Sequence, residues 1–155
     1  MAGFRVISGG TTVFVDTNAF ITLGRISDDA GLPRDLTLGS LVSNHFDTIT
    51  TTTVTGEINP LKGDGPLTLN SIAKNQMNGK LRVIDTLADF PVVRRSGNGE
   101  ASLVDVAAGN TNGRISILSD NTGDVRVLIE EEGLVASQHT LESFMTYSLT
   151  TGGVS

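Results

Sequence analysis

The sequence predicts an α/β fold, a three-layer α/β/α sandwich around a central, mostly parallel sheet. Two observations lead to this expectation. Short runs of β-forming residues alternate along the chain with segments whose apolar residues recur at helical spacing. The 155 residues also contain no long linker, low-complexity tract or fixed-period repeat, so residues 1–155 are expected to form a single domain.

Strong β-formers mark the first strand. Val13-Phe14-Val15 is a short apolar run, and the Asp16-Thr17-Asn18 that follows is typical of residues that cap a helix start. Residues 35–46 are predicted to be helical, and the threonine-rich residues 47–53 to be extended. The apolar residues on one face of that helix are Leu38, Leu41, Val42 and Phe46.

The middle of the chain continues the alternation. Glu57 lies close behind the threonine-rich segment, in the first turn of an element that Pro60 is expected to end. Residues 69–78 predict a short helix stopped by Gly79, because glycine readily leaves the helical conformation. Residues 81–85 predict another strand.

The last third of the chain adds two more strands and two more helices. Residues 96–99 predict a turn, 100–108 a helix, 115–118 a strand that ends in Ser119-Asp120, 125–129 a strand and 137–149 a final helix. The apolar residues at helical spacing are Leu103, Val106 and Ala107 in the first helix, and Leu141, Phe144, Met145 and Leu149 in the second.

Composition limits the chemistry that the chain can support. There is no cysteine, which excludes disulfides, thiolate metal sites and a cysteine nucleophile. His45 and His139 lie far apart, and neither has a second histidine at metal-ligand spacing. The ligands of any bound metal must therefore be oxygens, which suit hard ions such as Mg²⁺ or Mn²⁺.

Charge and hydropathy bear on partners. The net charge of −6 argues against a phosphate-gripping surface, unless carboxylates surround bound cations that reverse the local field. No apolar run approaches the roughly 20 residues that cross a bilayer. Residues 1–10 also lack the layout of a signal peptide, so no membrane association is expected.

Four acids follow the predicted strands or open the next element. Asp16 and Asp120 stand directly after strands, Glu57 follows the threonine-rich strand, and Glu100 opens a helix behind a glycine turn. In a parallel sheet these strand ends meet at one edge, where ligand sites of α/β folds lie. Four carboxylates there would repel one another unless cations were bound, so a site for one or two divalent ions is expected.

These stretches also carry a family resemblance. Residues 13–21 resemble the opening motif of PIN-domain ribonucleases, an apolar strand followed by Asp-Thr-Asn and an apolar helix start. Residues 53–58 resemble the second motif, with Gly56 where a paired glutamate often stands. Residues 97–102 are similar to the third, and residues 117–121 with Asp124 to the fourth, which is longer here. The order and rough spacing of all four match, and they cover nearly the whole chain.

The resemblance implies a role for each matching position. The acids that would act in catalysis are Asp16, Glu57, Glu100 and Asp120. The metal would be held by Asp16, Glu100, Asp120 and, through a second metal or a water, Asp124. The residues that would orient these carboxylates by hydrogen bonds are Thr17, Asn18 and Ser119. Apart from the resemblance, Arg94-Arg95 is a candidate contact for RNA phosphates.

The implied activity is that of an endoribonuclease that needs Mg²⁺ or Mn²⁺ and hydrolyses RNA with a metal-activated water. Proteins of this kind are often toxins that cut tRNA or rRNA in the cytoplasm and are restrained by a protein inhibitor, an antitoxin or immunity protein. A homodimer is also compatible with the resemblance. The abundant threonine and glycine and the lack of cysteine are compatible with delivery as part of a larger secreted toxin.

Each motif also has a purely structural explanation when taken alone. Asp16 could cap a helix, Glu100 could favour a helix dipole, residues 120–124 could form a polar turn, and Arg94-Arg95 could be a solvated pair. The alternative functions are a non-catalytic PIN-like binding module and a structural protein. An aspartate-nucleophile phosphatase is disfavoured, because Asn18 stands where that chemistry usually has a second aspartate.

Overall fold

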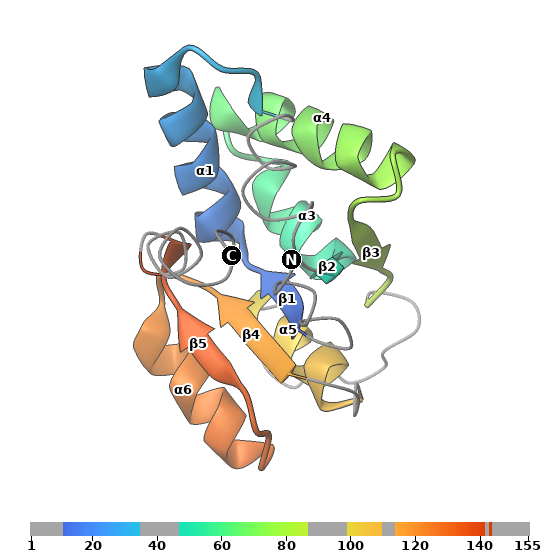
Figure 1. The fold of residues 1–155 in the computed structure, drawn as a ribbon, viewed down its shortest axis with the longest axis vertical. Coiled ribbons are helices and arrows are strands. Elements are labelled where there is room, and N and C mark those ends of the chain that lie inside the picture. The colour runs from blue at the N-terminus through green and yellow to red at the C-terminus, as the bar shows by residue number, and fades with distance from the viewer. Residues whose placement is uncertain (1–10, 35–46, 87–98, 110–113, 142, 144–155) are drawn as a thin grey trace, which may run out of the picture.

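Five parallel strands form one sheet at the centre of the computed structural model (Figure 1). They are β1 (Thr11–Val15), β2 (Asp47–Thr51), β3 (Arg82–Ile84), β4 (Arg114–Leu118) and β5 (Ser137–His139), in the spatial order β3-β2-β1-β4-β5. The structure describes residues 11–34, 47–86, 99–109, 114–141 and 143. The predicted α/β class is confirmed.

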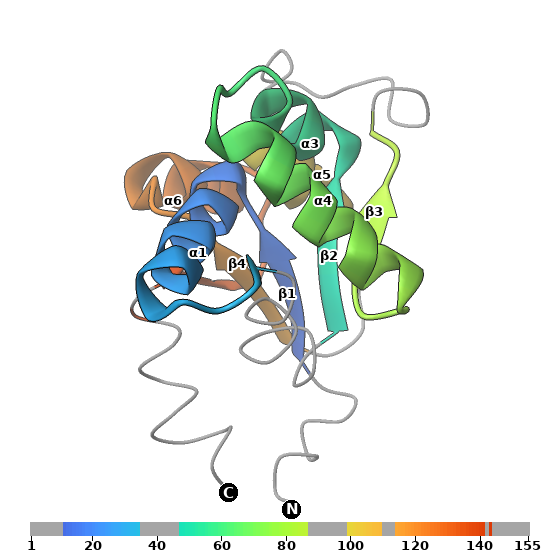
Figure 2. The same cartoon turned by 90° about the horizontal axis from the view of Figure 1, so that it is seen from above.

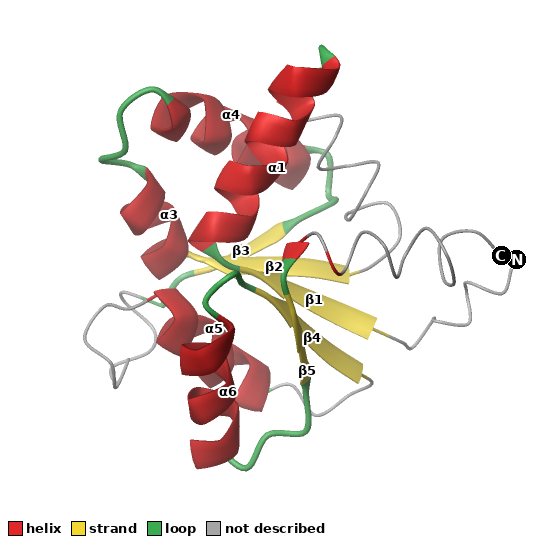
Figure 3. Ribbon diagram, turned by 90° about the vertical axis from the view of Figure 1, so that its left-hand side faces the viewer, coloured by secondary structure: helices red, strands yellow, loops and turns green. Residues whose placement is uncertain are grey.

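Helices cover both faces of the sheet (Figure 3). On one face lie α1 (Thr17–Ala30), α3 (Thr52–Ile58) and α4 (Asp64–Met77), and on the other lie α5 (Gly99–Ala108) and α6 (Thr122–Glu131). Figure 2 shows α1 and α4 over the same side of the sheet, where they contact each other. The arrangement is the predicted three-layer sandwich. Within the described residues, no helix has the length and apolar character needed to cross a lipid bilayer.

The core is centred on β1 and β4, which pair along their whole length. Val13, Phe14, Ile117 and Leu118 have no exposed surface. Strands buried on both faces are apolar at consecutive positions rather than alternating. This explains why the runs at 13–15 and 115–118 were recognisable as strands, and both predictions are confirmed. The predicted strand at 81–85 and helix at 100–108 are also present, as β3 and α5.

The strand predicted at 125–129 is wrong, because these residues lie in α6. Val125, Leu128 and Ile129 are buried while Arg126 and Val127 are exposed, which is the spacing of one helix face. Asp124 in the first turn also suits the positive end of the helix dipole. The many apolar residues of the segment suggested a strand, although their spacing is that of a helix.

The helix predicted at 137–149 is also wrong where it begins. Ser137–His139 form strand β5, which pairs with β4 in the register Ser116↔Ser137 to Leu118↔His139. The polar sequence has no strong strand signal, and the free edge of β4 supplies the hydrogen bonds that make it extended. Most of the remaining predicted helix lies outside the described residues.

Two further boundaries differ from the prediction. Extended structure ends at Thr51 instead of at residue 53, because the Thr51 side chain accepts a hydrogen bond from the Val54 N–H and caps α3. Glu57 therefore lies in the last turn of α3, and not in the first turn of that element as expected. Helix α4 starts at Asp64, before the predicted residue 69, and ends just before Gly79 as predicted. The helix predicted at 35–46 and most of the 96–99 turn lie outside the described residues.

The strand order places a switch point beside β1. After β1 the chain builds β2 and β3 on one side, and it then crosses to build β4 and β5 on the other. In parallel α/β sheets, ligands bind beyond the carboxyl ends of the strands at such a switch. Here that position follows Val15 of β1 and Leu118 of β4, which are register partners.

Candidate active site at the switch point

Asp16 lies at the switch point, directly after β1, and caps α1. Its Oδ1 accepts a hydrogen bond from the Thr17 N–H at 2.8 Å, and its Oδ2 accepts one from the Ser119 hydroxyl at 2.8 Å. Its own N–H donates to the Leu118 carbonyl at 2.9 Å. The residue is only 3% exposed. The carboxylate is therefore fixed from β1, α1 and the end of β4 at once.

Ser119 joins Asp16 to the end of β4 and to β5. Besides donating to Asp16, its hydroxyl accepts from the Asn121 N–H at 3.1 Å. Its N–H donates to the His139 carbonyl at 2.9 Å, and its carbonyl accepts from the Gln138 side chain at 2.8 Å. The structure thus places Ser119 where the sequence prediction had it, as a partner that orients an acid.

Glu57 reaches the same place from α3. Its Oε1 accepts a hydrogen bond from the Thr17 hydroxyl at 2.7 Å, and its Oε2 accepts one from the Gly99 N–H at 2.9 Å. Thr17 is the first residue of α1 and Gly99 is the first residue of α5. Glu57 therefore bridges the amino-terminal ends of two helices, where the helix dipoles favour negative charge.

Glu100 is the next residue of α5 and is also buried, at 7% exposed. Burial, with a smaller contribution from the charges of Glu100 and Glu57, raises the pKa of the Asp16 carboxyl from its ordinary value of 3.8 to about 6, although the hydrogen bonds from Ser119 and Thr17 lower it. The structure thus brings Asp16, Glu57 and Glu100 within electrostatic range of one another. We call these three residues the acidic site.

The two other predicted acids are placed differently. Asp120 is exposed, and its Oδ2 accepts a long hydrogen bond of 3.4 Å from the Thr22 hydroxyl of α1. Asp120 thus lies on the rim, next to Ser119 and facing α1. Asp124 is exposed and accepts from the Asn121 side chain at 2.9 Å, within the first turn of its own helix. Within the described residues, Asp124 makes no hydrogen bond with Asp16, Glu57 or Glu100.

Of the remaining predicted residues, one contacts the acidic site, one does not, and two lie outside the described residues. Thr17 contacts Glu57 through its hydroxyl and Asp16 through its N–H. Asn18 is exposed and its side chain makes no hydrogen bond with any described residue. The predicted RNA contacts Arg94 and Arg95 lie outside the described residues.

Three residues of the site were missed from the sequence. Gln138 and Thr22 carried no signal, because their roles depend on the pairing of β5 with β4 and on the path of α1. Gly99 did carry one, as a glycine directly before the predicted helix and its acid Glu100. A Cβ atom there would overlap Glu57 Oε1 and lie 3.1 Å from Val54 Cγ2.

The donor chemistry of the site fits a hard cation. The side-chain donors near Asp16 are oxygens, and the raised pKa of Asp16 shows that its negative charge is disfavoured, which a divalent ion would relieve. As they stand, however, no three acidic or imidazole side chains in the described part of the chain converge closely enough to hold an ion together. Asp16 and Glu100, the two acids that are buried among the described residues, are the candidate ligands, and a full set would need Asp120 to turn inward or water to complete it.

Comparisons with known proteins add no relative. No protein family model matches the chain, and neither the curated proteins nor the solved structures include a match. The assignment of function therefore rests on the sequence motifs and on the geometry of the acidic site.

Proposed function

We propose that the protein is a metal-dependent ribonuclease that hydrolyses RNA phosphodiester bonds at the acidic site. The observation that carries the proposal is the meeting of Asp16, Glu57 and Glu100 at the switch point, although the first and second lie 41 positions apart in the chain and the second and third 43 positions apart. The match of the four motifs to PIN-domain ribonucleases, and of their order, supports the choice of reaction.

The chain's own residues would orient the acids and shield them from water. Ser119 and the Thr17 N–H hold the two oxygens of Asp16, so the carboxylate keeps one orientation. Asp16 and Glu100 would hold Mg²⁺ or Mn²⁺, with exposed Asp120 as a further ligand and exposed Asp124 joining through a second metal or a water. When bound, the ion would lower the pKa of a water and neutralise charge on the phosphate.

The class of RNA comes from the resemblance. We propose tRNA or rRNA as the substrate, a toxic activity in the cytoplasm, and a protein inhibitor as partner. Delivery within a larger secreted toxin and dimerisation belong to the same proposal. Cells that make the protein without an inhibitor should stop growing, while cells making an equal amount of the Asp16→Asn variant should grow. Equal growth of the two cultures would count against the toxic role.

The enzymatic test uses purified protein and total RNA. Cleavage is expected with Mn²⁺ or Mg²⁺ and should stop when the metal is chelated. Asp16→Asn should reduce the rate by at least about 100-fold, beyond the range for residues that only support a metal ligand. Asp29→Asn is the matched control, because Asp29 is an exposed aspartate in the last turn of the same helix, and it should cleave at the wild-type rate. RNA left intact with several metals would refute the proposal.

A non-catalytic binding module is the second candidate function. The observation in its favour is that the contacts of Asp16 and Glu57 within the described residues also stabilise helix starts. The two functions differ in metal dependence. For a binding module, RNA would remain intact with Mn²⁺, and the wild-type protein and the Asp16→Asn variant would give the same result.

A further inference from the structure

We propose that Glu57 is a positioning residue whose carboxylate holds the starts of α1 and α5 together and so sets the spacing of Asp16 and Glu100. The inference rests on the proposed function and assigns Glu57 a different role from that of a metal ligand. Its basis is the identity of the two groups that the carboxylate binds.

Each partner of Glu57 is the direct chain neighbour of a buried acid. Thr17, which donates its hydroxyl to Oε1, follows Asp16, and Gly99, which donates its N–H to Oε2, precedes Glu100. One carboxylate therefore fixes the residue after one acid and the residue before the other. Because α1 and α5 lie on opposite faces of the sheet, this contact joins the two helical layers at the site.

Both oxygens of Glu57 are turned toward these donors. The hydrogen bonds are 2.7 and 2.9 Å long, the usual lengths of well-formed O–H···O and N–H···O bonds. Each oxygen of Glu57 binds the first residue of one helix, Thr17 of α1 or Gly99 of α5. We call this pair of hydrogen bonds the Glu57 bracket. Asp16 differs, because its raised pKa marks a charge that its surroundings disfavour.

The absence of a Cβ atom at Gly99 leaves the space that the Glu57 carboxylate occupies. A Cβ atom would overlap Glu57 Oε1, so an alanine would push the carboxylate away while keeping the backbone N–H that donates to it. Gly56, the neighbour of Glu57 in α3, offers the contrast. A Cβ atom there would meet nothing within 4 Å, and the residue is exposed. Gly56→Ala is therefore a matched control for Gly99→Ala.

The Glu57→Gln substitution distinguishes a residue that forms the bracket from one that binds the metal, because glutamine keeps the hydrogen-bonding groups and loses the charge. In Glu57→Gln the amide oxygen can accept from the Gly99 N–H, while the amide NH₂ can donate to the Thr17 hydroxyl, which is able to reverse its role. The bracket would thus survive the loss of the charge. A metal ligand or an essential charge would not survive the same substitution.

The experiment compares Glu57→Gln, Glu57→Ala, Gly99→Ala and Gly56→Ala with the wild-type protein. Mn²⁺ affinity is measured by electron paramagnetic resonance, RNA cleavage by gel, and protection of the Gly99 amide by hydrogen exchange. Glu57→Ala and Gly99→Ala should lose about 10- to 100-fold in metal affinity or rate, the range for partners that orient a ligand. Glu57→Gln and Gly56→Ala should stay within about threefold of wild type, short of that range.

Two results would overturn the inference. One is a Gln variant that loses Mn²⁺ affinity as fully as the Ala variant, which would make the charge of Glu57 the essential property. The other is a Gly99→Ala protein that binds Mn²⁺ and cleaves RNA like the wild type. If Glu57→Ala does not fold, the Gln and Gly99 variants still decide between the two roles.

Failure of the proposed function would be recognised separately. If wild-type protein neither cleaves RNA nor binds Mn²⁺, the nuclease proposal fails, and hydrogen exchange alone tests the bracket. The Gly99 amide should then be protected in the wild type and in Glu57→Gln, and should exchange faster in Glu57→Ala. Equal exchange in all three proteins would refute the bracket.

Discussion

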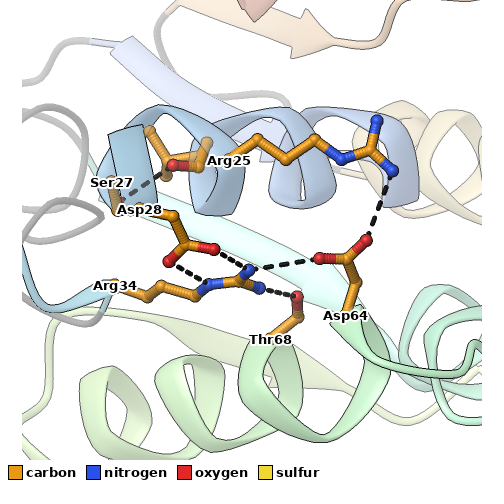
Figure 4. Close-up of polar contacts among 7 residues, drawn as sticks. Arg25, Ser27, Asp28, Arg34, Asp64 and Thr68 are labelled. Atoms are coloured by element: carbon orange, nitrogen blue, oxygen red, sulfur yellow. Dashed lines mark hydrogen bonds and ion pairs between the residues drawn. The ribbon is translucent and has the colours of Figure 1, made fainter. Parts of the chain in front are cut away.

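Helix α1 has a charged cluster at each end, and the two differ in how their charges are balanced. At its amino-terminal end lies the acidic site, where Asp16 and Glu57 bind only hydroxyl and backbone N–H donors among the described residues. Near its carboxyl-terminal end lies the Arg34 cluster, formed by Arg25, Asp28, Arg34, Asp64 and Thr68 (Figure 4). This second cluster contains two arginines and two aspartates.

Arg34 is the centre of its cluster and uses each of its nitrogens. Its Nε and Nη2 donate to the two oxygens of Asp28 at 3.2 and 2.6 Å, Nη2 also donates to Asp64 at 3.1 Å, and Nη1 donates to Thr68 at 3.2 Å. Arg25 pairs with the other oxygen of Asp64 at 3.2 Å. Because Asp28 belongs to α1 and Asp64 starts α4, the cluster ties these two helices together.

The pKa values of the acids shift in opposite directions at the two ends of α1. Hydrogen bonds from Arg34 lower the pKa of Asp28 and Asp64, and the hydrogen bond to Asp28 raises the pKa of Arg34, so these three groups favour the charged form. At the acidic site, burial raises the pKa of Asp16, and the neighbouring acids act in the same direction. A matched cluster stabilises the fold as it stands, whereas an unmatched one costs stability until a cation binds. The Arg34 cluster therefore stabilises the fold at one end of α1, and the acidic site at the other end is where the proposed reaction would take place.

The largest stability change is expected at Asp16. Its folded-state pKa of about 6 lies above its ordinary value of 3.8, so the folded protein binds the proton more tightly than the unfolded chain. The stability gained in this way is complete below pH 3.8 and is lost as the pH rises through about 6. Without metal at pH 7.5, Asp16→Asn should therefore raise the unfolding free energy, by at most roughly 3 kcal/mol.

Urea denaturation in EDTA at pH 4.5 and 7.5 checks this. The gain should be clear at pH 7.5 and smaller at pH 4.5, where the wild-type carboxyl is largely protonated. Mn²⁺ should then stabilise the wild type and not the variant. An Asp16→Asn protein that is less stable than wild type at both pH values would show that the acidic site is not strained.

The next largest change is expected at Arg34, in the opposite direction. Arg34→Met should lower the unfolding free energy by about 2 kcal/mol, between the values of exposed and buried ion pairs, since its side chain is only 10% exposed. Arg82→Met is the control, because Arg82 and Asp47 form an exposed pair, and its loss should stay below about 0.5 kcal/mol. Equal losses, measured by urea denaturation, would remove the distinction between the Arg34 cluster and a surface pair.

A smaller change is expected at Gly24. A Cβ atom there would lie 2.7 Å from Nη1 and 2.9 Å from Cζ of Arg34, so alanine would displace the guanidinium from its partners. The loss of these pairs outweighs the gain of about 1 kcal/mol from replacing glycine by alanine in a helix, leaving a net loss of about 1 kcal/mol. In the Arg34→Met background the sign should reverse, and a double-mutant cycle measures this. Destabilisation of the same size in both backgrounds would disprove the contact.

The sequence alone determined the features that act over one turn or one strand. The continuous apolar runs at β1 and β4 marked central parallel strands, and Asp16 was recognised as the capping residue between β1 and α1. The positions of the four motif acids relative to predicted elements pointed to one sheet edge. Even the error at 125–129 was local, since the burial of Val125, Leu128 and Ile129 follows a helical period that the sequence already contained.

The tertiary structure decided which of these residues meet. The extended conformation of β5 comes from pairing with β4, and the contact of Glu57 with the Gly99 N–H joins residues 42 apart in the chain. The hydrogen bond of Asp124 to the Asn121 side chain, instead of to an acid of the site, also appears only in the fold. Capping and periodicity depend on neighbours within a few residues, whereas these contacts depend on strand order and on how two helical layers pack against one sheet. A single sequence does not show which distant residues come into contact. The balance of charge at the two ends of α1 could therefore be determined only from the fold.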